Sequence, residues 1–116
     1  MTEEEMDLAF HALAHETRRR ILDLLRDRPG LAVGELARRF DVSRIAVMNH
    51  LTTLERANLV VSEREGRTRR LYLNATPIRI IHNRWIDDFS GHWADRLAGL
   101  KFAAEVAARQ QEDKKK

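Results

Sequence analysis

The chain of 116 residues is long enough for one domain with a modest hydrophobic core, and we expect a partner subunit to bury part of its apolar surface. It contains no cysteine, which excludes disulfide bonds, thiolate metal ligands and cysteine nucleophiles. No run of about eighteen apolar residues occurs and the start is acidic, so we expect no membrane span, no signal peptide, no membrane partner and a cytoplasmic location.

The positive charge is concentrated in the middle of the chain. Residues 1–16 contain five acidic residues and no lysine or arginine, whereas residues 17–70 contain thirteen arginines and seven acidic residues. Residues 71–116 contain eight basic and six acidic residues, and the whole chain has a formal net charge of +3. This distribution favours a polyanionic partner, with double-stranded DNA as the main candidate.

A first helix is predicted from about residue 3. Thr2 and Glu5 have the spacing of a capping box, and the acidic first turn suits the positive end of the helix dipole. Apolar residues then recur every three or four positions and form one stripe. They are Met6, Ala9, Phe10 and Leu13.

A second helix is predicted over about residues 16–27, and a Pro-Gly pair at 29–30 ends it. Its arginines at 18–20 form a solvated face or in part contact phosphates. His11 and His15 lie four residues apart, a spacing that can bind a metal. Because no third ligand is near, surface or capping roles are the simpler interpretation.

Residues 33–56 predict a helix-turn-helix, the arrangement that places one helix in the major groove of DNA. The apolar positions of the first helix are Val33, Leu36, Ala37 and Phe40. A turn at 41–43 follows, and Ser43 is suited to cap the second helix. The buried stripe of that helix is predicted to be Val47, Leu51 and Leu54.

The opposite face of the second helix carries groups that can contact bases. Asn49 can bond to an adenine edge, Arg44 and Arg56 can reach guanine or phosphate, and Ile45 can touch a thymine methyl. The residues of this segment that we expect to contact DNA are Ser43, Arg44, Ile45, Met48, Asn49, Thr52 and Arg56. The alternative is an ordinary amphipathic helix whose outer face contacts only solvent.

A β-hairpin is predicted after this helix, with strands at 59–64 and 67–73 and a tight turn at Glu65-Gly66. Leu71 and Leu73 should face the core. The arginines expected near the tip, where they would contact DNA, are Arg64, Arg67, Arg69 and Arg70. Arginine suits a narrow minor groove, so we interpret the hairpin as a wing, with a solvated loop as the alternative.

A last helix is predicted from Pro77, and Ser90-Gly91 could bend or break it. Its stripe of Ile78, Ile81, Trp85, Phe89, Trp93, Leu97 and Leu100 is too long for one small winged domain to cover, which predicts a homodimer. The expected interface residues are Met6, Phe10, Leu13, Ile81, Trp85, Phe89, Trp93 and Leu97. We expect a single domain over 1–110 and a disordered basic tail over 111–116.

Three runs of sequence resemble the ArsR family of bacterial winged-helix repressors: ALAHETRRRILDLL from residue 12, VGELARRFDVSRIAVMNHLTTLERANLV from residue 33 and REGRTRRLYLN from residue 64. The resemblance covers about residues 6–76. It implies a mainly α winged helix-turn-helix with a small β-hairpin, dimerising through its first and last helices. It also implies a sequence-specific transcriptional repressor that binds an inverted-repeat operator as a homodimer, with recognition helices in successive major grooves and wings at the flanking minor grooves.

The best-known members of this family sense metals, and this sequence departs from their patterns. Ala37 and Arg39 stand where the arsenic sensors carry cysteines, and Ile80 stands where another metal site has an aspartate. The partly matching residues of the last helix are His82, His92 and Asp95. A metal-responsive repressor is therefore an alternative; we expect no bound metal or cofactor, and these residues identify no small-molecule inducer.

Two other functional classes remain for comparison. The histidines and acidic residues are not accompanied by a nucleophile elbow, a glycine-rich phosphate loop or a metal triad, so we do not expect an enzyme. A winged-helix module that binds an acidic protein is the second alternative. Salt-sensitive binding with a preference for one DNA sequence would separate a regulator from such a module.

Overall fold

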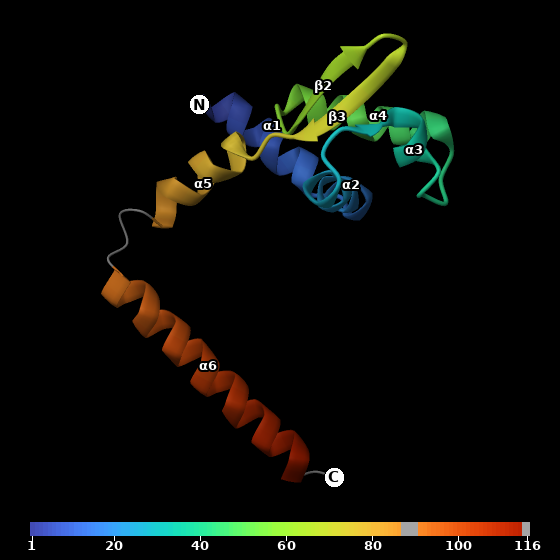
Figure 1. The fold of residues 1–116 in the computed structure, drawn as a ribbon. Coiled ribbons are helices and arrows are strands. Elements are labelled where there is room, and N and C mark those ends of the chain that lie inside the picture. Colours follow the sequence, from blue (N-terminus) through green and yellow to red (C-terminus); the bar gives the residue numbers. More distant parts are fainter. Residues whose placement is uncertain (87–90, 115–116) are drawn as a thin grey trace. The chain divides into compact units, whose positions relative to one another are not determined.

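The computed structural model describes residues 1–86 and 91–114, and their side chains except at 91–94 and 113–114 (Figure 1). The chain separates into two units, Met1–Ile81 and His82–Lys116. The first contains α1 (Glu3–Leu13), α2 (Glu16–Asp27), β1 (Leu31–Ala32), α3 (Val33–Ala37), α4 (Arg44–Arg56), β2 (Val60–Glu65), β3 (Thr68–Leu73) and most of α5 (Thr76–Ile86). The second contains the end of α5 and α6 (Gly91–Lys114).

The predicted mainly α fold with a small β-hairpin is confirmed, with one additional strand. The three strands are antiparallel in the order β1-β3-β2, and Leu31 of β1 lies opposite Leu71 of β3. The sequence predicted only the hairpin of β2 and β3. A strand of two residues is too short to show a periodic pattern in the sequence. It forms by pairing with the free edge of β3, which only the folded chain provides.

The helix starts follow the predicted capping signals. The Thr2 hydroxyl accepts a hydrogen bond from the Glu5 backbone N–H at 3.1 Å, and the Ser43 hydroxyl accepts one from Ala46 N–H at 3.1 Å. His15 caps α2, since its Nδ1 accepts from Thr17 N–H at 3.1 Å. The capping interpretation of His15 is therefore confirmed, and α4 begins where the sequence places it.

Replacing Ser43 with alanine is expected to lower the free energy of unfolding by about 1 kcal/mol, because the first turn of α4 loses its side-chain acceptor. Denaturant unfolding measures this change. Ser62→Ala on β2 is the matched control, since Ser62 is exposed and caps no helix, and its effect should stay within about 0.5 kcal/mol. Equal effects of the two substitutions would contradict the capping role.

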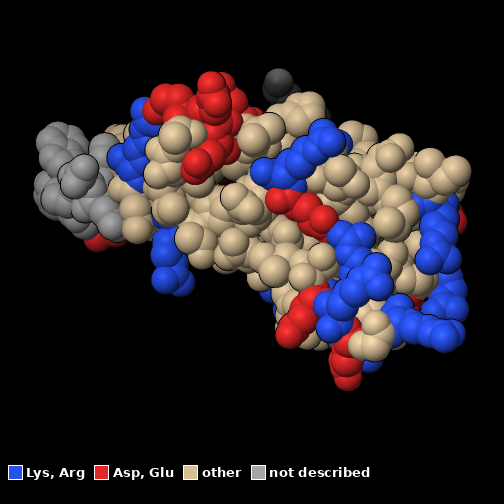
Figure 2. Space-filling model, turned by 90° about the horizontal axis from the view of Figure 1, so that it is seen from above, with Lys and Arg blue, Asp and Glu red and all other residues tan. Residues whose placement is uncertain are grey.

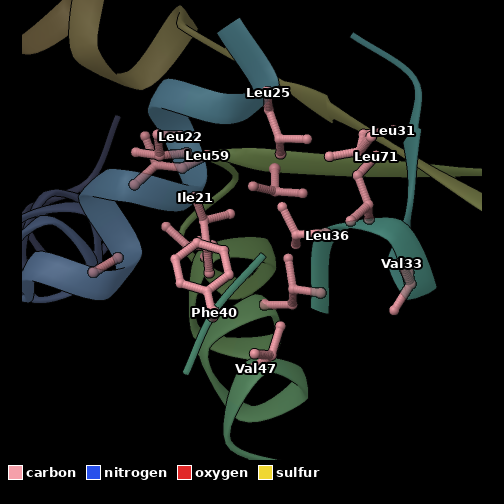
Figure 3. Packing of buried hydrophobic residues seen from close by; sticks show 14 of the residues in the cluster. Ile21, Leu22, Leu25, Leu31, Val33, Leu36, Phe40, Val47, Leu59 and Leu71 are labelled. Carbon is pink, nitrogen blue, oxygen red and sulfur yellow. The ribbon is translucent and has the colours of Figure 1, made fainter. Parts of the chain in front are cut away.

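The core lies where α2, α3 and α4 pack against the sheet, and its side chains point toward one another (Figure 3). Leu36, Leu54 and Leu71 are completely buried, and Val47 and Leu51 join them, as the apolar stripes predict. Met6 and Ala9 of α1 are buried as well. This packing leaves the other face of α4 and the outer part of the hairpin, residues 61–67, to solvent.

The last predicted helix is two helices in the described chain. α5 ends at Ile86 and α6 begins at Gly91, while residues 87–90 lie outside the described residues. α6 continues through Lys114, beyond residue 110 where the sequence analysis ends the helix. Glutamine, glutamate and lysine favour helix even without an apolar stripe, which explains the longer helix. Residues 115–116 of the predicted tail are not described.

Candidate nucleic-acid interface

The two faces of α4 differ as the sequence predicts. Val47, Leu51 and Leu54 point into the core, whereas the Ile45 side chain is 75% exposed. The polar residues of this segment that are expected to contact DNA are also exposed. They are Ser43, Arg44, Asn49, Thr52 and Arg56. α4 therefore presents a continuous outer face that carries hydrogen-bonding groups and one large apolar side chain.

Met48 and Thr52 differ in detail from the sequence interpretation. Met48 is half-buried and packs against the core, so only part of its side chain is available to a ligand. The Thr52 hydroxyl donates to the Met48 carbonyl at 3.0 Å. Because this hydroxyl has one hydrogen, Thr52 can only accept a hydrogen bond from a base while that contact holds.

The tip of the hairpin is a two-residue turn. Glu65 pairs with Thr68, which leaves Gly66 and Arg67 as the turn residues, and Gly66 has φ of +63°. A glycine with positive φ in the first turn position is the requirement of a type II′ hairpin. Arg64 and Arg67 are exposed, and neither forms an ion pair within the described chain. These two guanidinium groups are available to a polyanion.

Arg69 and Arg70 are arranged differently from the predicted group of four arginines. They occupy adjacent β3 positions, so their side chains leave opposite faces of the strand. Arg69 pairs with Glu55 of α4. Arg70 Nε donates to Glu65 Oε2 at 2.7 Å, and its Nη1 donates to the Gly30 carbonyl at 3.0 Å. Each charge is compensated by a carboxylate, which relieves the repulsion expected among four free guanidiniums.

A hollow of about 460 Å³ lies between the start of α3, the first part of α4 and the hairpin. Its lining includes four arginines, Arg44 from α4 and Arg64, Arg67 and Arg69 from the hairpin. Figure 2 shows many basic side chains on the right-hand side of this view, with a few acidic ones among them, and a compact acidic group with some basic neighbours toward the left. The hollow is therefore a strongly basic concavity beside the exposed face of α4.

Arg18 has a structural role that the sequence analysis missed. It is 8% exposed, and its Nε and Nη2 donate to the carbonyls of Ala12 at 2.8 Å and His11 at 3.0 Å. Its Nη1 lies 3.3 Å from Nδ1 of His50 on α4. Position 18 precedes the buried positions Ile21, Leu22 and Leu25 by three, four and seven residues. This helical spacing places Arg18 on the buried face of α2 and was the signal in the sequence that could have predicted its burial.

The other two consecutive arginines also contact the protein. Arg19 Nη1 donates to the Leu13 carbonyl at 2.7 Å, and the Arg20 guanidinium lies 5.1 Å from the centre of the Phe40 ring. Such a cation–π contact is favourable because the ring face is electronegative. Arg19 and Arg20 are exposed, as the predicted solvated face requires, although both also contact the protein; only Arg18 is buried.

His50 is expected to make stability depend on pH. Burial, then the nearby His15 ring and Arg18 guanidinium, hold the pKa of His50 below its ordinary value. Its stabilising contribution is complete above about pH 6.5 and is lost as the pH falls toward the lowered pKa, since the unfolded chain binds the proton more readily. Denaturant unfolding from pH 7.5 to 5.5 should show this decline. This decline in the free energy of unfolding should be smaller in His50→Gln. If stability depended on pH equally in the variant and the wild type, His50 would not be the group responsible.

The residues predicted for a dimer interface fall into three groups. Met6 is only 7% exposed and Leu13 packs against the core, because α1 uses this stripe to contact α2 and α4 of its own chain. Phe10, Trp85 and Leu97 are exposed and Ile81 is half-buried. Phe89 and the side chain of Trp93 lie outside the described residues. Met6 and most of Leu13 are thus removed from the surface available to a second chain.

Other large apolar side chains that the interface prediction omitted are exposed in the described helices. They include Leu8 of α1, Ile86 of α5, and Leu100 and Phe102 of α6. The exposed fractions of Trp85 and Phe102 are 53% and 66%. Exposed apolar groups of this size favour a binding partner.

The described side chains contain no group of three or more histidines, cysteines, aspartates or glutamates that could hold a metal ion. His82 instead lies beside Asn83, with 3.2 Å between Nδ1 and Oδ1. The His92 side chain lies outside the described set. Among the helices that the structure describes, none has both the length and the hydrophobicity required to cross a membrane.

Known sequences show the same organisation. A family model described as a helix-turn-helix domain matches residues 13–63. The HTH-type transcriptional regulator Rv2034 of Mycobacterium tuberculosis is 44% identical over 94 residues, covering 80% of this chain and 82% of the relative. The uncharacterized HTH-type transcriptional regulator YuzN of Bacillus subtilis is 39% identical over 87 residues, covering 70% and 95%. The transcriptional repressor SdpR of Bacillus subtilis is 32% identical over 84 residues, covering 72% and 91%.

Solved structures show the same fold. An ArsR-like transcriptional regulator from Rhodococcus sp. RHA1 is 34% identical and superposes with a TM-score of 0.66. The superposition covers 91% of this chain and 98% of that chain.

Proposed function

The chain belongs to the ArsR family of winged helix-turn-helix, DNA-binding transcriptional regulators, and on this premise we propose that it binds an inverted-repeat operator as a homodimer and represses transcription. The observation that most strongly supports this proposal is the exposed polar face of α4, which lies beside a basic hollow and a hairpin that carries arginines. The relative named as a transcriptional repressor supports the proposed direction of regulation. A dimer bound across a promoter would block access of the polymerase.

The outer face of α4 enters the major groove in this proposal. The exposed Asn49 amide offers a donor and an acceptor, which match an adenine edge, and Arg44 and Arg56 reach guanine or phosphate. The Thr52 hydroxyl accepts from an amino group of adenine or cytosine, because its hydrogen is committed to Met48. Ile45 contacts a thymine methyl. Base preference therefore resides in a few side chains of one helix.

The hairpin contacts the neighbouring backbone and minor groove. With α4 in the major groove, the sugar-phosphate backbone of the DNA that separates the two grooves passes over the hollow between α4 and the hairpin. Arg44, Arg64 and Arg67 line that hollow and carry uncompensated charge, which suits phosphates of any sequence. Arg64 and Arg67 of the hairpin supply affinity rather than base preference, whereas Arg44 of α4 can reach guanine or phosphate.

Homodimerisation is supported by the exposed apolar side chains of the last helices. Trp85 on α5 and Leu97, Leu100 and Phe102 on α6 are each about half or more exposed. A twofold dimer repeats α4, and two such helices reach successive major grooves when they lie about 34 Å apart. An inverted repeat is the DNA sequence that matches this symmetry.

Selection of bound fragments from random duplex DNA tests the proposal. We expect an inverted repeat with half-sites about 10 base pairs apart, and affinity for it should fall about a thousandfold between 50 and 200 mM salt. Transcription in vitro from a promoter that carries the repeat should fall when the protein is added. Salt-sensitive binding without enrichment of any sequence would instead support a module for acidic proteins.

A further inference from the structure

An ion pair joins α4, the proposed recognition helix, to the hairpin of β2 and β3, the proposed wing. Glu55 lies in the last turn of α4, and its carboxylate pairs with the guanidinium of Arg69 on β3. The two side chains are 29% and 30% exposed, so the pair is partly shielded from solvent. Arg69 also lines the basic hollow, which places the pair at the boundary between α4, the hairpin and the surface that contacts DNA.

We propose that Glu55 is a positioning residue that withholds Arg69 from DNA and fixes the wing relative to α4. The inference rests on the proposed function, since both roles concern DNA binding. It divides the four hairpin arginines into two classes. Arg64 and Arg67 contact phosphate, whereas Arg69, like Arg70, holds the protein together.

The charge of Arg69 is already compensated in the free protein. Phosphate binding by a cation releases one condensed counterion from DNA, and this release makes affinity depend on salt. A guanidinium that remains paired with Glu55 contributes little to that release, because the pair has no net charge. Arg64 and Arg67 have no such partner within the described residues, so they contribute fully.

The position of the pair explains its effect on geometry. Leu71 is completely buried and marks the point on β3 where the hairpin leaves the core. Toward the tip, residues 61–67 of β2 and the turn are all exposed. Arg69 lies on the same face of β3 as Leu71 and contacts α4 two residues closer to the tip. The pair therefore restricts the angle at which the outer hairpin projects from the recognition helix.

Four variants separate these roles, with the selected operator and a random duplex of equal length as probes. Glu55→Gln frees the Arg69 cation without changing side-chain size. The double variant Glu55→Gln/Arg69→Gln removes the pair and leaves the net charge unchanged. Arg67→Gln removes a cation that has no partner. The swap Glu55→Arg/Arg69→Glu rebuilds the pair in reverse, and thermal unfolding of each variant confirms that the chain is folded.

We expect Glu55→Gln to steepen the dependence of log affinity on log salt by about 0.9 per subunit, which is about 3.5-fold between 50 and 200 mM. The double variant should keep the wild-type slope, and Arg67→Gln should lower it by about 0.9 per subunit. The ratio of operator to random affinity should fall several-fold in Glu55→Gln and in the double variant. The swap should restore that ratio.

A double variant whose slope falls as much as that of Arg67→Gln would overturn the inference, because Arg69 would then be a phosphate contact. An unchanged operator-to-random ratio in the double variant would overturn the positioning role. In both cases wild-type binding to the operator would leave the proposed function intact. A wild-type chain that binds neither duplex would overturn the proposed function and this inference together.

Discussion

Replacing Trp85 with aspartate is expected to produce a monomer and to weaken operator binding by about a hundredfold or more. Trp85 is 53% exposed on α5, so the substitution leaves the core of the first unit unchanged. In a dimer, burial of each such aromatic contributes about 1.5–3 kcal/mol, whereas a buried carboxylate without a partner is strongly unfavourable. A monomer also loses the gain in affinity that comes from two linked half-site contacts.

Light scattering measures the mass of the variant, and a binding titration with the selected operator measures its affinity. Trp85→Phe is the matched control, because it retains an apolar ring and should retain both the dimer and most of the affinity. Binding to a single half-site should be weak and equal in the two variants. An aspartate variant that keeps the mass of a dimer would show that Trp85 lies outside the interface.

Local signals in the sequence account for most of the fold. The spacing of Thr2 and Glu5 marks the start of α1, and the capping hydroxyl of Ser43 marks the start of α4. Period-3.6 stripes give the buried faces of α2 and α4, and Gly66 locates the hairpin turn, which lies at Gly66-Arg67, one residue later than the predicted Glu65-Gly66. Each of these signals involves residues a few positions apart, so a single sequence is sufficient to detect it.

Several of the interactions that the sequence did not reveal join residues that are distant along the chain. Arg69 forms an ion pair with Glu55, fourteen residues earlier, and Arg70 donates a hydrogen bond to the carbonyl of Gly30, forty residues earlier. Whether an arginine on a hairpin faces solvent or a carboxylate depends on how the elements pack. Met6 illustrates the same limit, because an apolar stripe on α1 predicts burial but does not specify whether its own chain or a second chain supplies the contact.

The second major expected effect is a loss of base preference on replacing Asn49 with alanine. The exposed amide of Asn49 is suited to a paired contact with one adenine, so its removal should cost about 1–3 kcal/mol on the operator, or roughly 5–150-fold in affinity. Affinity for a random duplex should stay the same. Repeating the selection with the variant should show relaxed preference at one position of each half-site and unchanged preference elsewhere.

Arg67→Ala provides the comparison, because a phosphate contact at the wing should weaken operator and random duplex alike and should lower the salt dependence. Arg26→Ala on α2 controls for net charge, since Arg26 is exposed, pairs with Asp27 at 3.0 Å and lies outside the basic hollow. It should change neither base preference nor the salt dependence appreciably. If Asn49→Ala and Arg67→Ala reduced both affinities in the same proportion, α4 would not be the element that distinguishes bases, since a specific contact must affect the operator more than random DNA.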